Sequence, residues 1–326
     1  MKLSSGQWKE ILASHGAEHT DDPARGPSAV PRPTASPTSP DSGAVHFDLS
    51  GGVAPSCELQ SVTYVLALEG GPTPDPKWGF WERALDEVVQ TMQPAPSITH
   101  IELCMAPNAR HDDMHFATYL GAKANWGASF GGQRDFYLGH NASNWRAIPI
   151  VCRDASARLR VECAKHVGTE YSIAKYICAI PPLRALAGLL SDVPQTPAHC
   201  AILTARCLKA ALPEVGLSHP SSWFGPSTLF LDLDSDAKRA TFHQRMVDAD
   251  PHVRAIAEDE SETRAMHTLL HGSDDDILPM DEEACALAIH RLTVRSLEPG
   301  LDDVAKRIVQ KQLATALLRY SVVKNA

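Results

Sequence analysis

Alternating apolar and polar positions mark several β-strands in the first two thirds of the chain. Val62, Tyr64, Leu66 and Leu68 alternate with less apolar neighbours, which predicts a strand whose more apolar face is turned to the core. Four further segments have strand-like patterns: Ile98–Met105, His115–Leu120, Arg146–Val151 and Ser227–Leu233.

Other segments repeat their apolar residues at helical spacing. This spacing predicts helices over Trp81–Met92 and Ser156–Val167, and a less regular helical stretch over Tyr171–Leu190. Strands and helices are segregated along the chain rather than strictly alternating. We therefore expect an α+β domain with a mostly antiparallel sheet.

Composition divides the chain into three parts. Residues 1–44 contain six prolines between Pro23 and Gly43, among Ala, Ser and Thr. Such a stretch buries too little apolar surface to offset its ordering entropy, so we expect a flexible arm that could order on a protein partner. Residues 45–234 contain the strand and helix patterns of the folded domain, and residues 235–326 form an acidic, helical C-terminal extension.

The C-terminal extension itself changes character along its length. Between Asp248 and Glu283 twelve acidic residues stand against only Arg254 and Arg264, which is typical of a solvated, partly mobile segment. An amphipathic helix is then expected after Pro299, and it could dock on the domain or on another protein. Its apolar face consists of Val304, Ile308, Leu313, Leu317 and Tyr320.

The bulk properties exclude several classes of protein. A net charge of −9 over 326 residues, without a dense basic stripe, argues against a nucleic-acid partner. The sequence has no run of eighteen apolar residues and no secretory leader, so we expect a cytoplasmic protein, or a virion component if it is viral. Its eight cysteines include no CxxC pair, so they are expected to be free thiols, with no metal or other cofactor.

Cys200 is the candidate nucleophile. A helix is expected to begin with Thr196 as N-cap and Pro197 as first helical residue, and to run to Pro213, which places Cys200 in its first turn. Unpaired N–H groups there favour thiolate over thiol and could stabilise an oxyanion. The alternative is an ordinary buried core cysteine, which we also expect for Cys207.

A thiol nucleophile requires a base and a group that orients the base. In the strand Ile98–Met105, alternation places His100 and Glu102 on the same face, so His100 is the candidate base. His115, on the next strand, is the candidate orienting residue, with Glu102 in reserve. Other interpretations remain: the histidines could be structural, or His111 and His115 could form a metal pair if that segment were helical.

The order of these elements resembles a known family. A strand Thr99-His100-Ile101-Glu102-Leu103, a second strand ending in Gly121, a helix leading to Gly168 and a helix opening with Cys200 are similar to the circularly permuted papain-like, or NlpC-like, cysteine hydrolases, which include viral relatives. The resemblance covers residues 60–233 and implies a small antiparallel sheet packed against the nucleophile helix. It also implies Cys200 as nucleophile, His100 as base and His115 as third member. The segment 122–144 has no counterpart and could form a lid or a contact surface.

Two functions follow from the sequence. The first is a cysteine hydrolase, most simply a peptidase or amidase, that acts on a peptide, protein or acyl substrate through a thioester at Cys200. The second is a catalytically silent structural protein, possibly of a viral particle, in which the N-terminal arm and the C-terminal helix bind protein partners.

Overall fold

The computed structural model of the protein describes residues 61–70, 91, 94–105, 114–119, 127–130, 144–172, 175–176, 197–249, 260–272 and 281–323. The predicted arm over residues 1–44, nearly all of the helix over Trp81–Met92 and most of the stretch Tyr171–Leu190 lie outside the described residues.

The described part of the chain has an α+β fold built on one antiparallel sheet. Its strands are β1 (Val62–Glu69), β2 (Ile98–Met105), β3 (His115–Tyr119), β4 (Gly127–Phe130) and β5 (Trp145–Val151), arranged in the order β4-β3-β2-β1-β5. The α-helices are α5 (Ala155–Ala164), α8 (Cys200–Ala211), α9 (Pro226–Leu233), α10 (Asp236–Ala249), α11 (Glu260–His271), α13 (Glu282–Leu297) and α14 (Asp303–Val323). The predicted α+β class and antiparallel sheet are confirmed.

Four predicted strands are present, within a residue or two of their expected ends. However, β1 does not turn one face to the core and the other to solvent, because the side chains of Val62 to Leu68 are all buried. β4 was not predicted: Gly127–Phe130 lies in the segment 122–144 and pairs with β3 as the edge of the sheet. It was missed because four residues rich in Gly and Ser show no clear alternation.

The prediction of a strand over Ser227–Leu233 is wrong, because this segment forms helix α9. Gly225 is its N-cap, Pro226 occupies the first turn, and the Thr228 hydroxyl accepts a hydrogen bond from the Gly225 amide at 2.9 Å. Leu229, Phe230 and Leu233 are buried, which is helical spacing rather than alternation. A proline at the first helical position was the signal in the sequence that favoured the helix.

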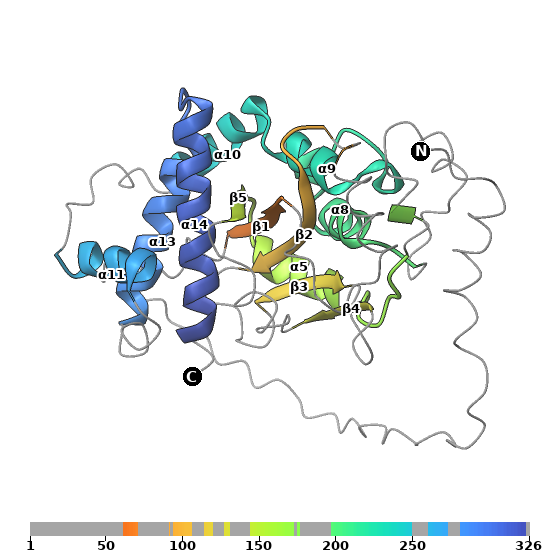
Figure 1. Cartoon of the computed structure of the whole chain (residues 1–326), viewed down its shortest axis with the longest axis horizontal. Helices are drawn as coiled ribbons and strands as arrows, with labels where there is room; N and C mark the ends of the chain where they lie inside the picture. Colours follow the sequence, from red (N-terminus) through yellow and green to blue (C-terminus); the bar gives the residue numbers. More distant parts are fainter. Residues whose placement is uncertain are drawn as a thin grey trace, which may run out of the picture. The chain divides into compact units, whose positions relative to one another are not determined.

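Two groups of helices pack against different parts of the sheet (Figure 1). Helices α10, α13 and α14 contact β5 at one edge, whereas α8 contacts β2 and β3 near the other. Helix α5 packs against α8, and α9 against β2. The Ser227 hydroxyl of α9 accepts a hydrogen bond from the Ile98 amide at 2.9 Å, so α9 is fixed at the beginning of the strand that contains His100.

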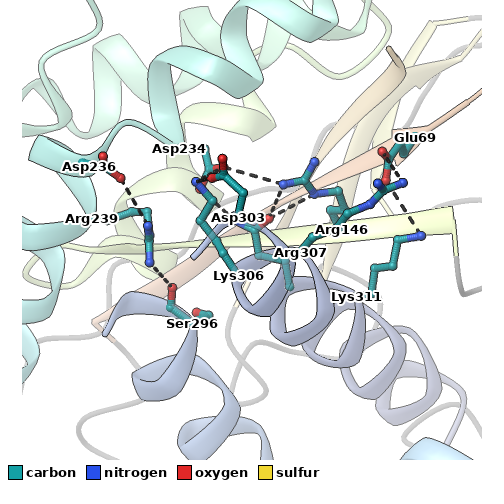
Figure 2. Close-up of polar contacts among 11 residues, drawn as sticks. Glu69, Arg146, Asp234, Asp236, Arg239, Ser296, Asp303, Lys306, Arg307 and Lys311 are labelled. Carbon is teal, nitrogen blue, oxygen red and sulfur yellow. Dashed lines mark hydrogen bonds and ion pairs between the residues drawn. The ribbon is translucent and has the colours of Figure 1, made fainter. Parts of the chain in front are cut away.

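Helix α14 docks on the domain, which is one of the two positions expected for the terminal helix. Arg146 of β5 donates two hydrogen bonds to the Gln310 side chain, at 3.0 and 2.6 Å. Gln310 in turn donates to Asp234, at the end of α9, at 2.8 Å. Figure 2 shows Lys306 and Arg146 both directed at the Asp234 carboxylate, each 3.7 Å from Oδ2. These polar contacts join α14 to β5 and to the end of α9.

Further ion pairs extend this interface along α14. Arg307 lies 2.8 Å and Lys311 3.9 Å from the carboxylate of Glu69 at the end of β1 (Figure 2). The predicted helix start after Pro299 is also confirmed, because the Asp302 side chain accepts a hydrogen bond from the Ala305 amide at 2.7 Å. The predicted apolar face is confirmed at Leu313, Leu317 and Tyr320, which are buried, but it is wrong at Val304 and Ile308, which are exposed.

Part of the acidic segment is helical, whereas residues 250–259 and 273–280 lie outside the described residues. Helix α11 lies within it, and Glu262, Ala265 and Leu269 are buried there. Glu262 forms an ion pair with Arg291 of α13, which explains how an acidic residue is accommodated in this packed position.

None of the described helices has the length and hydropathy needed to cross a bilayer.

The docking of α14 can be tested by truncating a buried side chain. Leu317 is fully buried, so Leu317→Ala should lower the free energy of unfolding by about 2–5 kcal/mol, measured by urea denaturation. On the same helix Ile308 is 52% exposed, so Ile308→Ala should change it by no more than about 0.5 kcal/mol. Equal losses in the two variants would contradict the docked position of α14.

Candidate active site

Cys200 is the first residue of α8, with His199 as N-cap. The predicted helix start was therefore wrong by three residues: Pro197 precedes the helix, and Thr196 lies outside the described residues. Residues before the helix instead adopt an extended conformation, because Ala198 forms a parallel bridge with Tyr171. Cys200 still lies in the first turn of the helix, as expected, where the amide groups have no partners within the helix.

Backbone hydrogen bonds connect the approach to α8 with the edge of the sheet. Ala198 donates to the carbonyl of Glu170 at 2.9 Å and accepts from the amide of Ser172 at 3.2 Å. The same segment reaches β4, because the Ala128 amide donates to the Thr169 carbonyl at 2.8 Å. The unpredicted strand β4 thus helps to fix the position of the candidate nucleophile.

Close packing explains the glycine at the start of β4. Gly127 has φ +118°, and a Cβ atom at this position would lie 2.7 Å from the carbonyl oxygen of Thr169. Only glycine permits both this backbone conformation and this close approach.

The strand β2 brings His100 and Glu102 to the sulfur. They lie two residues apart on one face of the strand, and the Nε2 atom of His100 is 3.7 Å from Oε2 of Glu102. The imidazole of His100 is close enough to the Cys200 sulfur for each group to shift the pKa of the other. Trp145 of β5 packs edge-on against the imidazole, with ring centroids 6.0 Å apart, and thereby restricts its orientation.

The register of β3 places His115 on the far side of Glu102. His115 is paired with Cys104, so the two side chains lie on the same face of the sheet. Glu102, two residues before Cys104, lies on this face too and is a diagonal neighbour of His115. Its Nδ1 atom lies 3.1 Å from Oε1 of Glu102. The carboxylate of Glu102 therefore lies between two imidazoles. Glu102, the reserve candidate, contacts His100, whereas His115 contacts Glu102 and orients it.

The charges of this cluster favour a thiolate and an imidazolium. Burial alone would raise the pKa of the Cys200 thiol, but the charge and hydrogen bond of His100, together with His199, outweigh it and lower the pKa to about 5. Burial alone would lower the pKa of His100, but the charge and hydrogen bond of Cys200, followed by those of Glu102, raise it to about 9. Proton transfer from sulfur to imidazole is therefore favourable at neutral pH.

The Glu102 carboxylate is fully buried and needs its two partners to remain ionised. Burial opposes ionisation, but the hydrogen bonds and charges of His100 and His115 outweigh it, so the pKa of Glu102 is lower than the ordinary value. A buried anion of this kind stabilises a neighbouring cation, as the carboxylate does in other nucleophile–histidine–acid sites. The arrangement can supply a nucleophile, a proton donor and an orienting anion.

The other cysteines of the described chain have a different chemistry. All six described cysteines are free and buried. Burial raises the pKa of Cys104 and Cys163 well above the ordinary value, and that of Cys152 and Cys285 to about 11. Among these residues Cys200 is the cysteine whose pKa is lowered, which follows from its imidazole neighbours.

From the sequence, His199 could be a second base or simply a polar residue of the first helical turn, and the second interpretation is favoured. The structure places it directly beside Cys200 as the N-cap of α8, fully buried. A polar residue preceding a candidate nucleophile was the available signal, but its burial could not be read from the sequence. The hypothetical metal pair of His111 and His115 is not supported: His115 lies on a strand, His111 lies outside the described residues, and the described part of the chain contains no cluster of three metal-binding side chains.

Comparisons with family models, curated proteins and solved structures returned no match to this chain. The assignment of the site therefore depends on its own geometry.

The role of Glu102 can be tested on the thiolate itself. Glu102→Gln removes the anion that favours imidazolium, so the pKa of His100 should fall and that of Cys200 should rise above about 5. Thiolate absorbance near 240 nm during a pH titration measures this change, after subtraction of the signal of the same protein with Cys200→Ala.

Glu162 provides a matched control, because it forms a second glutamate–histidine pair, with His166, at 3.3 Å. Glu162→Gln should leave the titration of Cys200 unchanged. If both variants shifted the midpoint equally, or neither did, Glu102 would have no specific effect on the sulfur.

Proposed function

We propose that the protein is a cysteine hydrolase with Cys200 as nucleophile and His100 as its acid and base. The chemistry that fits best is cleavage of a peptide or isopeptide bond, with transfer of a lipid or thioester acyl group as the less favoured variant. The papain-like architecture expected from the sequence is part of this proposal. Papain-like hydrolases and this chain share a helix that begins with the candidate nucleophile and packs on an antiparallel sheet.

The observation that supports the proposal most is the contact of Cys200 with His100 at the first turn of α8. A thiol at a helix start with an imidazole beside it meets the requirements for an activated sulfur. The third requirement, a group that fixes the base, is met by Glu102.

The reaction would proceed in two steps. The Cys200 thiolate attacks the substrate carbonyl carbon, and amide groups at the start of α8 stabilise the negative oxygen that develops. The C–N bond breaks as His100 donates its proton to the leaving nitrogen, which leaves a thioester on Cys200. His100, now neutral, then takes a proton from water as the water oxygen attacks the thioester. The C–S bond breaks, the carboxylic acid product leaves, and the Cys200 thiolate and protonated His100 are restored.

One observation favours a second function, a structural protein without turnover. Cys200 is only 1% exposed, so the sulfur is covered in this structure. In that case the C-terminal helix α14 and the N-terminal arm would serve assembly, for example in a viral particle. The two functions differ in whether a reagent can reach the sulfur.

Labelling with a fluorescent chloroacetamide probe distinguishes them. The hydrolase hypothesis predicts that Cys200 is labelled faster than the other cysteines at pH 7 and that Cys200→Ala removes this labelling. His100→Ala should slow it by about tenfold or more, because loss of the imidazolium raises the pKa of Cys200 and leaves less thiolate at pH 7. Cys207→Ala, a buried cysteine of the same helix, is the matched control and should be labelled like the wild type. Equal labelling of wild type and Cys200→Ala would favour the structural function.

The labelling rate should also depend on pH in a defined way. Because the pKa of Cys200 is about 5, the thiolate is present above this value, and the rate should fall as the pH is lowered through it. The imidazolium of His100 is present below about pH 9, so the ion pair occupies the interval between the two values. A rate that rises only near pH 9, as for an ordinary thiol, would contradict an activated sulfur.

A further inference from the structure

Helix α11 carries two histidines side by side on its exposed face. His267 and His271 are four residues apart in a continuous α-helix, so they are neighbours on the helix surface, and both are exposed. Their ring centroids lie 5.2 Å apart, with the ring planes inclined by 58°. The spacing is the one considered above for His111 and His115, but here the segment is helical.

The packing of α11 fixes the face on which these rings lie. Leu269 is buried, and the buried side chain of Glu262 pairs with Arg291 of α13. Arg319 of α14 donates a hydrogen bond to the Leu269 carbonyl at 3.2 Å. One face of α11 is thus held by two other helices, and the two histidines stay on the opposite face.

The distance between the rings suits a shared metal ion. A zinc ion lies about 2.0–2.1 Å from each coordinating imidazole nitrogen, which places each ring centre about 3.2 Å from the ion. Two rings bound at a tetrahedral angle therefore have their centres about 5 Å apart. The observed distance of 5.2 Å agrees with this value, so coordination requires rotation of the two side chains but no movement of the helix.

The end of the helix provides a favourable charge for a cation. His271 is the last residue of α11, and the carbonyl groups of the last turn carry partial negative charge. A cation bound between the two rings lies beside this turn.

We propose that His267 and His271 form a two-imidazole site for a divalent transition-metal ion such as Zn²⁺. Imidazole nitrogen suits Zn²⁺, Cu²⁺ and Ni²⁺, whereas Mg²⁺ and Ca²⁺ prefer oxygen ligands. Two protein ligands leave two positions of a tetrahedral ion for water or for a side chain of a binding partner. The site lies on a different helix from Cys200 and does not depend on the proposed function.

Calorimetric titration of the full chain with ZnCl₂ tests the site. Every sample carries Cys200→Ala, which removes the candidate nucleophile as a competing ligand. Loss of an outer partner of a metal ligand lowers affinity about 10–100-fold, so loss of a ligand itself should lower it at least about tenfold. Because the two rings bind one ion together, His267→Asn, His271→Asn and the double variant should be equally defective. Independent imidazoles would instead lose half of the binding in each single variant.

His219 provides the matched control, because it is an exposed histidine that stacks on Trp223. His219→Asn should bind Zn²⁺ like the reference protein, and Mg²⁺ should not compete. The replaced side chains are exposed, so urea unfolding in EDTA should be the same in all variants, which separates loss of the site from loss of the fold. Unchanged binding in His267→Asn, half of the binding in each single variant, or an equal loss in His219→Asn would overturn the inference. A reference protein that binds no Zn²⁺ below millimolar concentration would also overturn it.

Discussion

The contact between the Cys200 sulfur and the His100 imidazole is the interaction on which the candidate site depends. The sulfur is buried and the imidazole is largely buried, and burial alone would leave a neutral thiol and a neutral imidazole. Their mutual attraction, reinforced by Glu102, reverses both tendencies. Burial dominates at Cys104, Cys163, Cys152 and Cys285, whose pKa values are raised.

The sheet provides the geometry that this contact requires. The alternation of β2 places His100 and Glu102 on one face, and the register with β3 adds His115 next to the carboxylate. The edge strand β4 then holds the segment 168–172, which in turn holds Ala198. The position of the sulfur is thus determined by hydrogen bonds that extend across the sheet to its edge, far from Cys200 in the sequence.

The chain has a second buried ionic cluster with a different character. Arg146, Asp234, Lys306 and Gln310 satisfy one another at the interface between α14 and the sheet. Arg146 also lies 4.4 Å from the centre of the Phe230 ring, so its guanidinium is enclosed on several sides. This cluster has no nucleophile, and its groups are directed at each other, so we interpret it as the attachment of the C-terminal extension.

The sequence by itself determined the elements whose signals are local. Alternation identified four of the five described strands and placed His100 and Glu102 on one face, because side-chain direction in a strand follows from the backbone alone. Capping signals placed Cys200 at a helix start, where the amides are unpaired. The helix α9 had a local signal in Pro226, which the interpretation of the segment as a strand overlooked. Only the tertiary structure decided that β4 completes the sheet, that Glu102 rather than His115 contacts the base, and that His199 is buried next to Cys200. These features depend on strand register and on packing between residues distant in the chain, and no local pattern specifies either.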